Sequence, residues 1–240
     1  MTISFQKEGS IMNKKCGLIL FLILTLFAAC CALAEVKVGD MLTFGQYEQD
    51  NEEADGKEPI EWRVLAVSGN EAQLISAYAL DAQPYNTTYK RASWVNSSLR
   101  AWLNSDFYND AFSDAEKAAI VTKSVVNRKE ENTADAVTLL SCDEAKQLFA
   151  DHPDRMAQPT EYAAAKNLYR SKKYGPGNVQ WWLRTTSWED YRRAAYVAGS
   201  GGVMTCGGNT DGRVDNTRWS VRPVIYLDIA AYEAQQTTAE

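Results

Sequence analysis

The sequence predicts an α+β fold, a single domain with a mixed or antiparallel sheet, flanking helices and a loop-rich C-terminal lobe. Apolar residues alternate with polar ones in segments near both ends of the chain, which is the period of strands. Between these ends, apolar residues recur every three or four positions, which is the period of helices. The last third of the chain is rich in glycine, which indicates turns and loops.

Strands are expected first in residues 41–47 and 60–65, which alternate apolar and polar side chains on either side of an acidic, glycine-containing stretch. Residues 72–78 form another apolar run after Ser68-Gly69-Asn70, a sequence typical of a hairpin turn. These three segments predict a meander.

Helical spacing begins at Ser97 and places a set of apolar side chains on one face. This set is Leu99, Trp102, Leu103 and Phe107. We interpret these aromatic residues as core. A later helix is expected at residues 160–167, directly after Pro159.

Two further helices are expected where a serine is followed three residues later by glutamate. Ser113 with Glu116, and Ser141 with Glu144, fit the capping box, which satisfies free amides of a first helical turn. Residues 137–140 are apolar and predict a buried strand that leads into the second box.

The last third is expected to return to strands, at residues 181–184 and 194–198. Residues 199–212 hold six of the 14 glycines and are expected to form turns and loops. A final strand is expected at 220–227, and because Pro223 interrupts it, the pattern places it at a sheet edge.

The first 34 residues have the pattern of a secretory signal peptide. Lys14 and Lys15 precede an almost wholly apolar stretch, and the small residues before Ala34 suit cleavage after it. A lipoprotein signal with lipidation at Cys30, or a retained membrane anchor, are the alternatives. The chain then divides into a signal peptide (1–34), one domain (35–228) and a C-terminal tail (229–240), and we expect a secreted or cell-surface protein.

Composition limits the partners of that domain. A hydrophobic content of 45% suits one packed core. The net charge is −6 although the leader is positive, so nucleic acid is not an expected partner. Membrane contact is expected only through a lipid anchor or a retained leader.

Two cysteines, Cys142 and Cys206, lie outside the leader. In an oxidising compartment they either form a disulfide or stay as two separate buried thiols, and the sequence leaves both possibilities open.

Several short motifs carry a resemblance to a known family. They are Phe44-Gly45-Gln46-Tyr47, Ile60-Glu61-Trp62, Tyr78-Ala79-Leu80-Asp81, Ser98-Leu99-Arg100-Ala101-Trp102-Leu103-Asn104, Trp181-Trp182-Leu183-Arg184 and Val221-Arg222-Pro223. In this order, over nearly all of the mature chain, they resemble the bacterial domain of unknown function 6273. The resemblance implies no activity.

The paired tryptophans, the glycine-rich segment and the closing Val-Arg-Pro strand are also similar in layout to the C-type-lectin-like fold of formylglycine-generating enzymes. That likeness implies that the first and last strands pair, that helices flank their sheet, and that residues 185–219 form an exposed functional lobe. The enzymes of that group use copper and two nearby cysteines, whereas Cys206 has no cysteine close in sequence. Oxidase activity is therefore not expected.

Catalytic and metal patterns are sparse. The only histidine, His152, is expected in a solvated loop, which argues against triad catalysis and zinc. Asn209, Asp211 and Asp215, beside glycines, suit either turns or an oxygen-ligated calcium ion, the only cofactor considered. If the protein is a hydrolase, its candidate catalytic residues are three carboxylates near predicted strand ends. These are Asp81, Glu189 and Asp190.

A concentration of aromatic and guanidinium groups stands out in residues 186–219. Its members are Trp188, Tyr191, Arg192, Arg193, Arg213, Arg218 and Trp219. Because such groups are enriched at binding hot spots, we expect a noncatalytic module that recognises a protein or carbohydrate through these loops. The alternatives are a cell-envelope enzyme, such as a hydrolase, and a structural surface protein without a small ligand.

Overall fold

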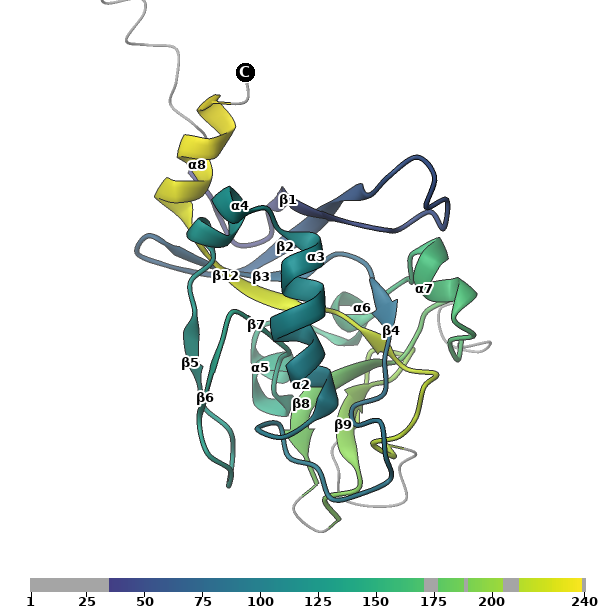
Figure 1. Cartoon of the computed structure of the whole chain (residues 1–240). Helices are drawn as coiled ribbons and strands as arrows, with labels where there is room; N and C mark the ends of the chain where they lie inside the picture. The colour runs from purple at the N-terminus through teal and green to yellow at the C-terminus, as the bar shows by residue number, and fades with distance from the viewer. Residues whose placement is uncertain (1–34, 171–176, 188–189, 205–211, 239–240) are drawn as a thin grey trace, which may run out of the picture. The chain divides into compact units, whose positions relative to one another are not determined.

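Two five-stranded sheets organise the computed structural model, which describes residues 35–170, 177–187, 190–204 and 212–238 (Figure 1). The first sheet is antiparallel and runs in the order β1 (Met41–Tyr47), β2 (Glu58–Ser68), β3 (Glu71–Ser76), β12 (Val224–Asp228) and β7 (Val137–Thr138). The second runs in the order β10 (Val203–Met204), β9 (Ala194–Val197), β8 (Trp181–Thr186), β11 (Ser220–Val221) and β4 (Asp81–Ala82). It is mixed, because β8 and β11 are parallel. The predicted α+β class is confirmed.

The expected meander forms the first half of the first sheet. Strands β1, β2 and β3 pair antiparallel in sequence order. Between Thr43 and Gln46 the register shifts, and Gly45 there has a φ of 72°. A Cβ atom at Gly45 would lie 2.6 Å from the Phe112 ring, so both the backbone angle and the space require glycine.

The closing strand differs from its prediction. It is split into β11 and β12, and both are interior strands of their sheets, so the expected edge position is wrong. Pro223, which has no N–H to donate, lies between the two strands where the chain passes from the second sheet to the first. Its carbonyl oxygen accepts a hydrogen bond from the Ser76 amide at 3.0 Å.

The pairing of first and last strands, implied by the C-type-lectin-like layout, is absent among the described residues. Strand β1 pairs with β2, and β12 pairs with β3 and β7. The strand between positions 137 and 140 is also shorter than expected, since only β7 pairs.

Helices form at the capping signals that the sequence contains. Ser97 caps one continuous helical segment made of α2 (Ser98–Trp102), a π-helical turn η1 (Leu103–Phe107) and α3 (Tyr108–Ala111). Both capping boxes are formed, at the starts of α4 (Asp114–Ala119) and α5 (Cys142–Gln147). The others are α6 (His152–Arg155), α7 (Glu161–Ala165) and α8 (Ile229–Thr238).

The segment after residue 228 begins with a helix that packs back on the domain. The Asp228 carboxylate accepts a hydrogen bond from the Ala231 amide at 2.9 Å at the start of α8. Gln235 donates to the Ala115 carbonyl oxygen of α4 at 2.8 Å. Within the described residues, no helix has both the length and the apolarity to cross a lipid bilayer.

Apolar clusters lie on both faces of the sheets within Val36–Glu240, which form one unit. Alternation along β8 shows this arrangement. Trp182 belongs to the cluster that contains the α2–α3 segment, whereas Trp181 and Leu183 belong to the cluster that contains α5. Both faces are therefore buried, which explains why β8 is apolar throughout its first half.

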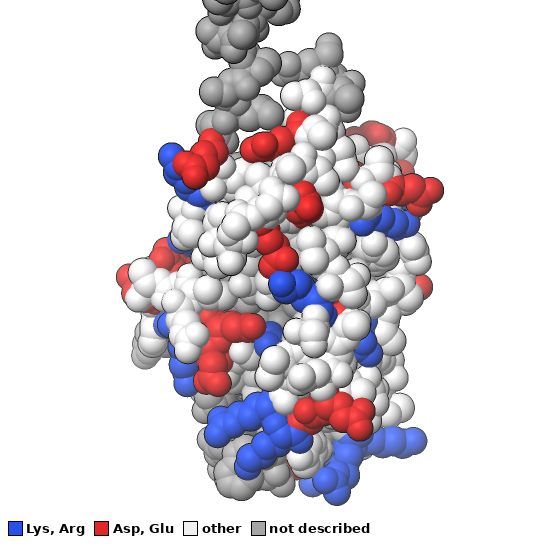
Figure 2. Space-filling view, turned by 90° about the vertical axis from the view of Figure 1, so that its left-hand side faces the viewer, with Lys and Arg blue, Asp and Glu red and all other residues white. Residues whose placement is uncertain are grey.

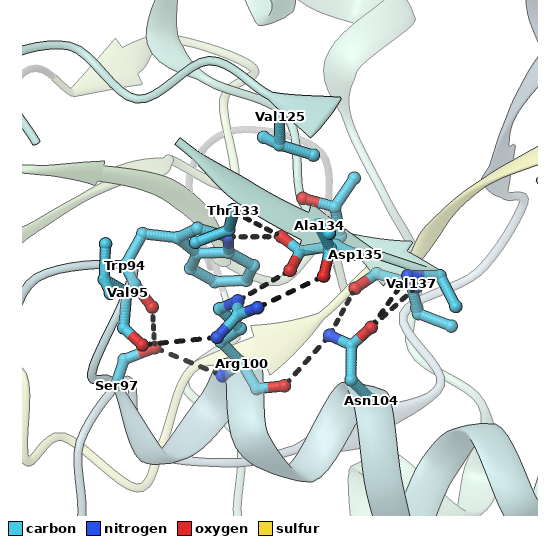
Figure 3. A network of polar contacts seen from close by, with 12 residues as sticks. Trp94, Val95, Ser97, Arg100, Asn104, Val125, Thr133, Ala134, Asp135 and Val137 are labelled. Carbon is cyan, nitrogen blue, oxygen red and sulfur yellow. Dashed lines mark hydrogen bonds and ion pairs between the residues drawn. The ribbon is translucent and has the colours of Figure 1, made fainter. Parts of the chain in front are cut away.

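A buried carboxylate fixes the start of α2 against the hairpin of β5 (Lys123–Val125) and β6 (Thr133–Asp135) (Figure 3). The side chain of Asp135 is fully buried and accepts from Arg100 Nε at 2.6 Å. It also accepts from Trp94 Nε1 at 2.8 Å and from Thr133 Oγ1 at 2.9 Å. Three donors therefore share one buried acceptor, while the Arg100 side chain remains 25% exposed.

Asn104, one turn further along the helix, completes the outer edge of β7 (Figure 3). Its amide nitrogen donates to the Val137 carbonyl oxygen at 2.8 Å, and its oxygen accepts from the Val137 amide at 3.2 Å. The side chain thus takes the place of a neighbouring strand and covers an edge that would otherwise be open to pairing.

Candidate functional site

Part of the predicted binding set meets at one hollow of about 580 Å³. The hollow is lined by Tyr169, Gln180, Arg213, Asp215, Asn216, Thr217, Arg218 and Trp219. Its volume lies in the range of small-ligand sites. Three of the seven residues that the sequence singled out therefore surround the same concavity.

The loop that carries these residues is fixed to the frame at two points. The Ala194 amide of β9 donates to the Gly212 carbonyl oxygen at 2.7 Å, and the Tyr169 amide donates to the Arg218 carbonyl oxygen at 3.0 Å. A Cβ atom at Gly212 would lie 2.2 Å from the Ala194 oxygen, so glycine permits this close approach. The backbone on both sides of the hollow is thereby positioned.

Arg213 is held by its own loop. It donates to both carboxylate oxygens of Asp215, from Nε at 3.0 Å and from Nη2 at 2.8 Å. This hydrogen bonding keeps the pKa of the Asp215 carboxyl below its ordinary value, so the pair stays ionised at neutral pH. The Arg213 side chain is still 54% exposed and presents the rest of its plane to solvent.

Arg218 is arranged differently. Its Nε donates to the Asn167 carbonyl oxygen at 3.4 Å, and its guanidinium carbon lies 5.7 Å from the ring centroid of Tyr169, a side chain that is 48% exposed. Among the described residues, no carboxylate lies within 4.0 Å of this guanidinium. Within the part of the chain that the structure describes, this positive group beside an open aromatic ring has no neutralising charge.

A second aromatic and guanidinium group adjoins the hollow, and we call it the Tyr89 face: Tyr89, Arg192 and Arg213. The guanidinium carbons of Arg192 and Arg213 lie 5.1 and 4.3 Å from the Tyr89 ring centroid. Arg192 is oriented by Asp190, at 2.8 Å. Because Arg213 belongs to both groups, the hollow and the Tyr89 face adjoin.

Sequence reasoning missed Tyr89, which is 39% exposed. It precedes Lys90 and Arg91, and this aromatic and basic run was the available signal. Figure 2 shows Lys and Arg side chains gathered at the lower end of the face it presents. Figure 1 shows ends of β8 and β9 at that same height.

The other predicted binding residues are less open. Tyr191 is half-buried, with the Arg91 guanidinium carbon 4.8 Å from its ring centroid. Arg193 is half-buried, and its Nε lies 3.8 Å from an Asp190 oxygen. Trp188 lies outside the described residues.

Trp219 requires a correction, because it is a core residue. It is only 3% exposed, and its ring centroid lies 4.4 Å from that of Trp182 and 3.8 Å from that of Tyr196. An indole packed in this way forms the base of the hollow and has little surface for a partner. We therefore remove Trp219 from the set of contact residues.

The calcium site stays a prediction, and Asp215 is the one of its three candidate ligands, Asn209, Asp211 and Asp215, that lies within the described residues. Asp215 is bound by Arg213, and a hard cation would have to displace that guanidinium. Asn209 and Asp211 lie outside the described residues.

Another trio of carboxylates could hold a cation. Oxygens of Glu48, Asp50 and Glu58 lie within 4.8 Å of one another, but backbone amides of the same segment already donate to each of them.

The candidate catalytic carboxylates have structural partners. Asp81 is buried and accepts from Tyr47 Oη and from Lys166 Nζ, each at 2.6 Å. Asp190 is held by Arg192, and Glu189 lies outside the described residues. His152 is exposed at the first position of α6, a short helix where a loop was expected.

A second cavity of about 380 Å³ adjoins the start of α5. Its buried Arg184 forms an ion pair with Glu144, and Glu130 accepts from Thr186. Cys142 there is a buried free thiol, and burial raises its pKa, which is the opposite of what a nucleophile needs. Cys206, its possible disulfide partner, lies outside the described residues.

Comparison with known proteins gives one match. A family model described as a domain of unknown function, DUF6273, matches residues 69–229. The chain belongs to the DUF6273 family. No curated protein and no solved structure matches it. The matched region of the DUF6273 domain includes the hollow and the Tyr89 face, while β1 and β2 up to Ser68 precede it.

The motifs that carry the resemblance to DUF6273 mostly serve the fold. Their polar atoms bond inside the domain at Tyr47, Trp62, Asp81, Arg100, Asn104, Trp181, Trp182, Arg184 and Arg222. For example, buried Arg222 donates to the Ser76 carbonyl oxygen at 2.9 Å and lies over the Trp181 ring. Two of these motifs, at residues 44–47 and 60–62, precede the matched region, and the other four lie within it. These motif residues hold the fold together, and the residues around the hollow are a separate set.

Proposed function

We propose that this DUF6273 protein is an exported, noncatalytic binding module that recognises a protein or a glycan through the hollow and the Tyr89 face. The observation that carries the proposal is the convergence of Arg192, Arg213 and Arg218 on two exposed tyrosine rings, Tyr89 and Tyr169. Tyr gives a large contact area at little entropic cost, Arg gives a planar set of donors, and both are enriched in binding hot spots.

Two further proposals concern the location and the fold of this module. The leader supports export with cleavage after Ala34, with lipidation at Cys30 or a retained anchor as alternatives. A C-type-lectin-like layout is supported by helices flanking two sheets, while the pairing of β1 with β2 argues against it.

Binding is favoured over hydrolysis by the state of the carboxylates. A glycosidase needs one carboxyl group as an acid and an opposed one as a base or nucleophile. Asp81 is neutralised by Lys166, and Asp190 by Arg192. The hydrogen bonds from Arg192 lower the pKa of the Asp190 carboxyl, which makes Asp190 a poor proton donor.

The test is binding of the purified full-length protein to glycan and envelope-protein arrays, with and without calcium. We expect a ligand whose binding is lost in a Tyr89→Ala, Arg213→Ala double variant. Arg128→Ala is the matched control, because it removes one exposed positive charge from the β5–β6 connection, outside the hollow. If the unfolding curve of the double variant matches that of the parent protein, the loss of binding is due to the substituted side chains and not to unfolding.

Other outcomes decide against the proposal. Turnover of a cell-wall glycan that is abolished by one carboxylate substitution would establish the hydrolase instead. Binding that persists in the double variant, or no binding at all, would favour a structural surface protein.

A further inference from the structure

We propose that the hollow beside Arg218 is a subsite for an acidic glycan, whose carboxylate or phosphate is taken by Arg218 while a sugar ring packs on Tyr169. This inference rests on the proposed binding function and narrows its ligand to one class.

The charge argument comes from the contrast between the two arginines of the hollow. Arg213 is neutralised by Asp215, at 2.8 Å, whereas Arg218 has no described carboxylate within 4.0 Å. Its Nε is directed to the Asn167 carbonyl oxygen at 3.4 Å, which leaves the two Nη groups as donors. A guanidinium that is oriented through Nε and has both Nη groups available suits bidentate binding of a carboxylate or phosphate.

The glycan argument comes from the composition of the walls. Next to Arg218 stand the exposed ring of Tyr169 and three side chains with amide or hydroxyl groups, Gln180, Asn216 and Thr217. The hollow has no aliphatic side chain in its lining, whereas the centres of protein interfaces are more apolar. The hydroxyl groups of a sugar can form hydrogen bonds with the amide side chains. The C–H face of a sugar can pack on the Tyr169 ring, because the face of an aromatic ring carries partial negative charge.

Anchoring of the loop also favours a ligand of modest size. The Tyr169 amide donates to the Arg218 carbonyl oxygen at 3.0 Å, so the ring and the guanidinium are carried on joined segments. The Arg218 amide donates to Asn216 Oδ1 at 2.9 Å, which fixes the turn. Such a prepared site loses little entropy when a short oligosaccharide binds.

The experiment uses the full-length protein and matched probes in a binding titration. The probes are oligogalacturonate, its methyl ester, poly(glycerol phosphate) and polyglutamate. The first two differ only in charge, the third presents phosphate in place of carboxylate, and the fourth presents carboxylates on a peptide. We expect binding of oligogalacturonate that weakens as salt rises, and none of the methyl ester. Poly(glycerol phosphate), which has no sugar ring to pack on Tyr169, is expected to bind more weakly than oligogalacturonate.

Three variants locate the binding. Arg218→Ala is expected to weaken it by about tenfold to a hundredfold, the range for a lost charged hydrogen bond. Arg218→Lys, which keeps the charge and loses the planar fork, should restore only part of the affinity. Arg128→Ala should leave it unchanged. All are compared by unfolding curves with the parent protein.

The outcomes separate this inference from the proposed function. Equal binding of the acid and its methyl ester, or binding of polyglutamate alone or of poly(glycerol phosphate) alone, overturns the acidic-glycan subsite. A partner whose binding is lost in the Tyr89→Ala, Arg213→Ala variant but unchanged in Arg218→Ala also overturns the acidic-glycan subsite. That result would still agree with the proposed binding module. Binding of no probe overturns the subsite, and the array result then decides the module separately.

Discussion

Replacing Asp135 by Ala is expected to destabilise the protein by about 4 kcal/mol. The change leaves Arg100, Trp94 and Thr133 without their common acceptor (Figure 3). Removing one partner of a buried charged pair costs roughly 3–5 kcal/mol, and the middle of this range applies because Asp135 is fully buried while Arg100 is 25% exposed. Since domains are stable by about 5–15 kcal/mol, this is a large share.

Urea unfolding followed by tryptophan fluorescence measures the loss. The matched control is Asp110→Ala, which breaks a pair with Lys57 in which the two side chains are 37% and 50% exposed. That variant should lose less than about 1 kcal/mol. Asp135→Asn, which keeps the shape and one acceptor, should fall between the two and covers the case in which Asp135→Ala does not fold. If Asp135→Asn proves as stable as Asp110→Ala, the buried carboxylate does not hold this helix, and the reasoning fails.

Three further predictions concern single positions. Gly45→Ala should lower stability by about 2 kcal/mol or more in thermal unfolding, because of its positive φ and the nearby Phe112 ring; an unchanged melting temperature would contradict this. Cys142 should react with iodoacetamide at least about tenfold more slowly in the native protein than in urea, because burial raises its pKa and blocks access. For Glu144, burial raises the pKa but the bond from Arg184 outweighs it, so the net pKa is lowered and the stabilisation is lost as pH falls below 4.5. Glu144→Gln should therefore flatten acid unfolding below that pH, and an identical acid limb would refute the assignment.

Local signals in the sequence predicted most elements correctly, because each depends on neighbours along the chain. The two capping boxes need only a serine and a glutamate three residues apart, and both form. The meander likewise follows from alternation and a turn. Strand order depends on distant segments, and for this reason Pro223 suggested an edge while β12 occupies an interior position.

The candidate site was predicted in part. Composition identified Arg213 and Arg218, which do line one hollow. It could not separate an exposed aromatic residue from a buried one, so Trp219 was included although it packs on Trp182. Tyr89 was missed because its arginine partners lie more than a hundred positions along the chain.

The interior position of β12 also governs when the fold can be completed. This strand joins the meander to β7, and β11 just before it joins β8 to β4, and both strands follow all the others along the chain. Neither sheet is complete without residues 220–228, so the fold can finish only after the pairs β1–β2, β2–β3 and β8–β9, which do not need these residues, are joined by them.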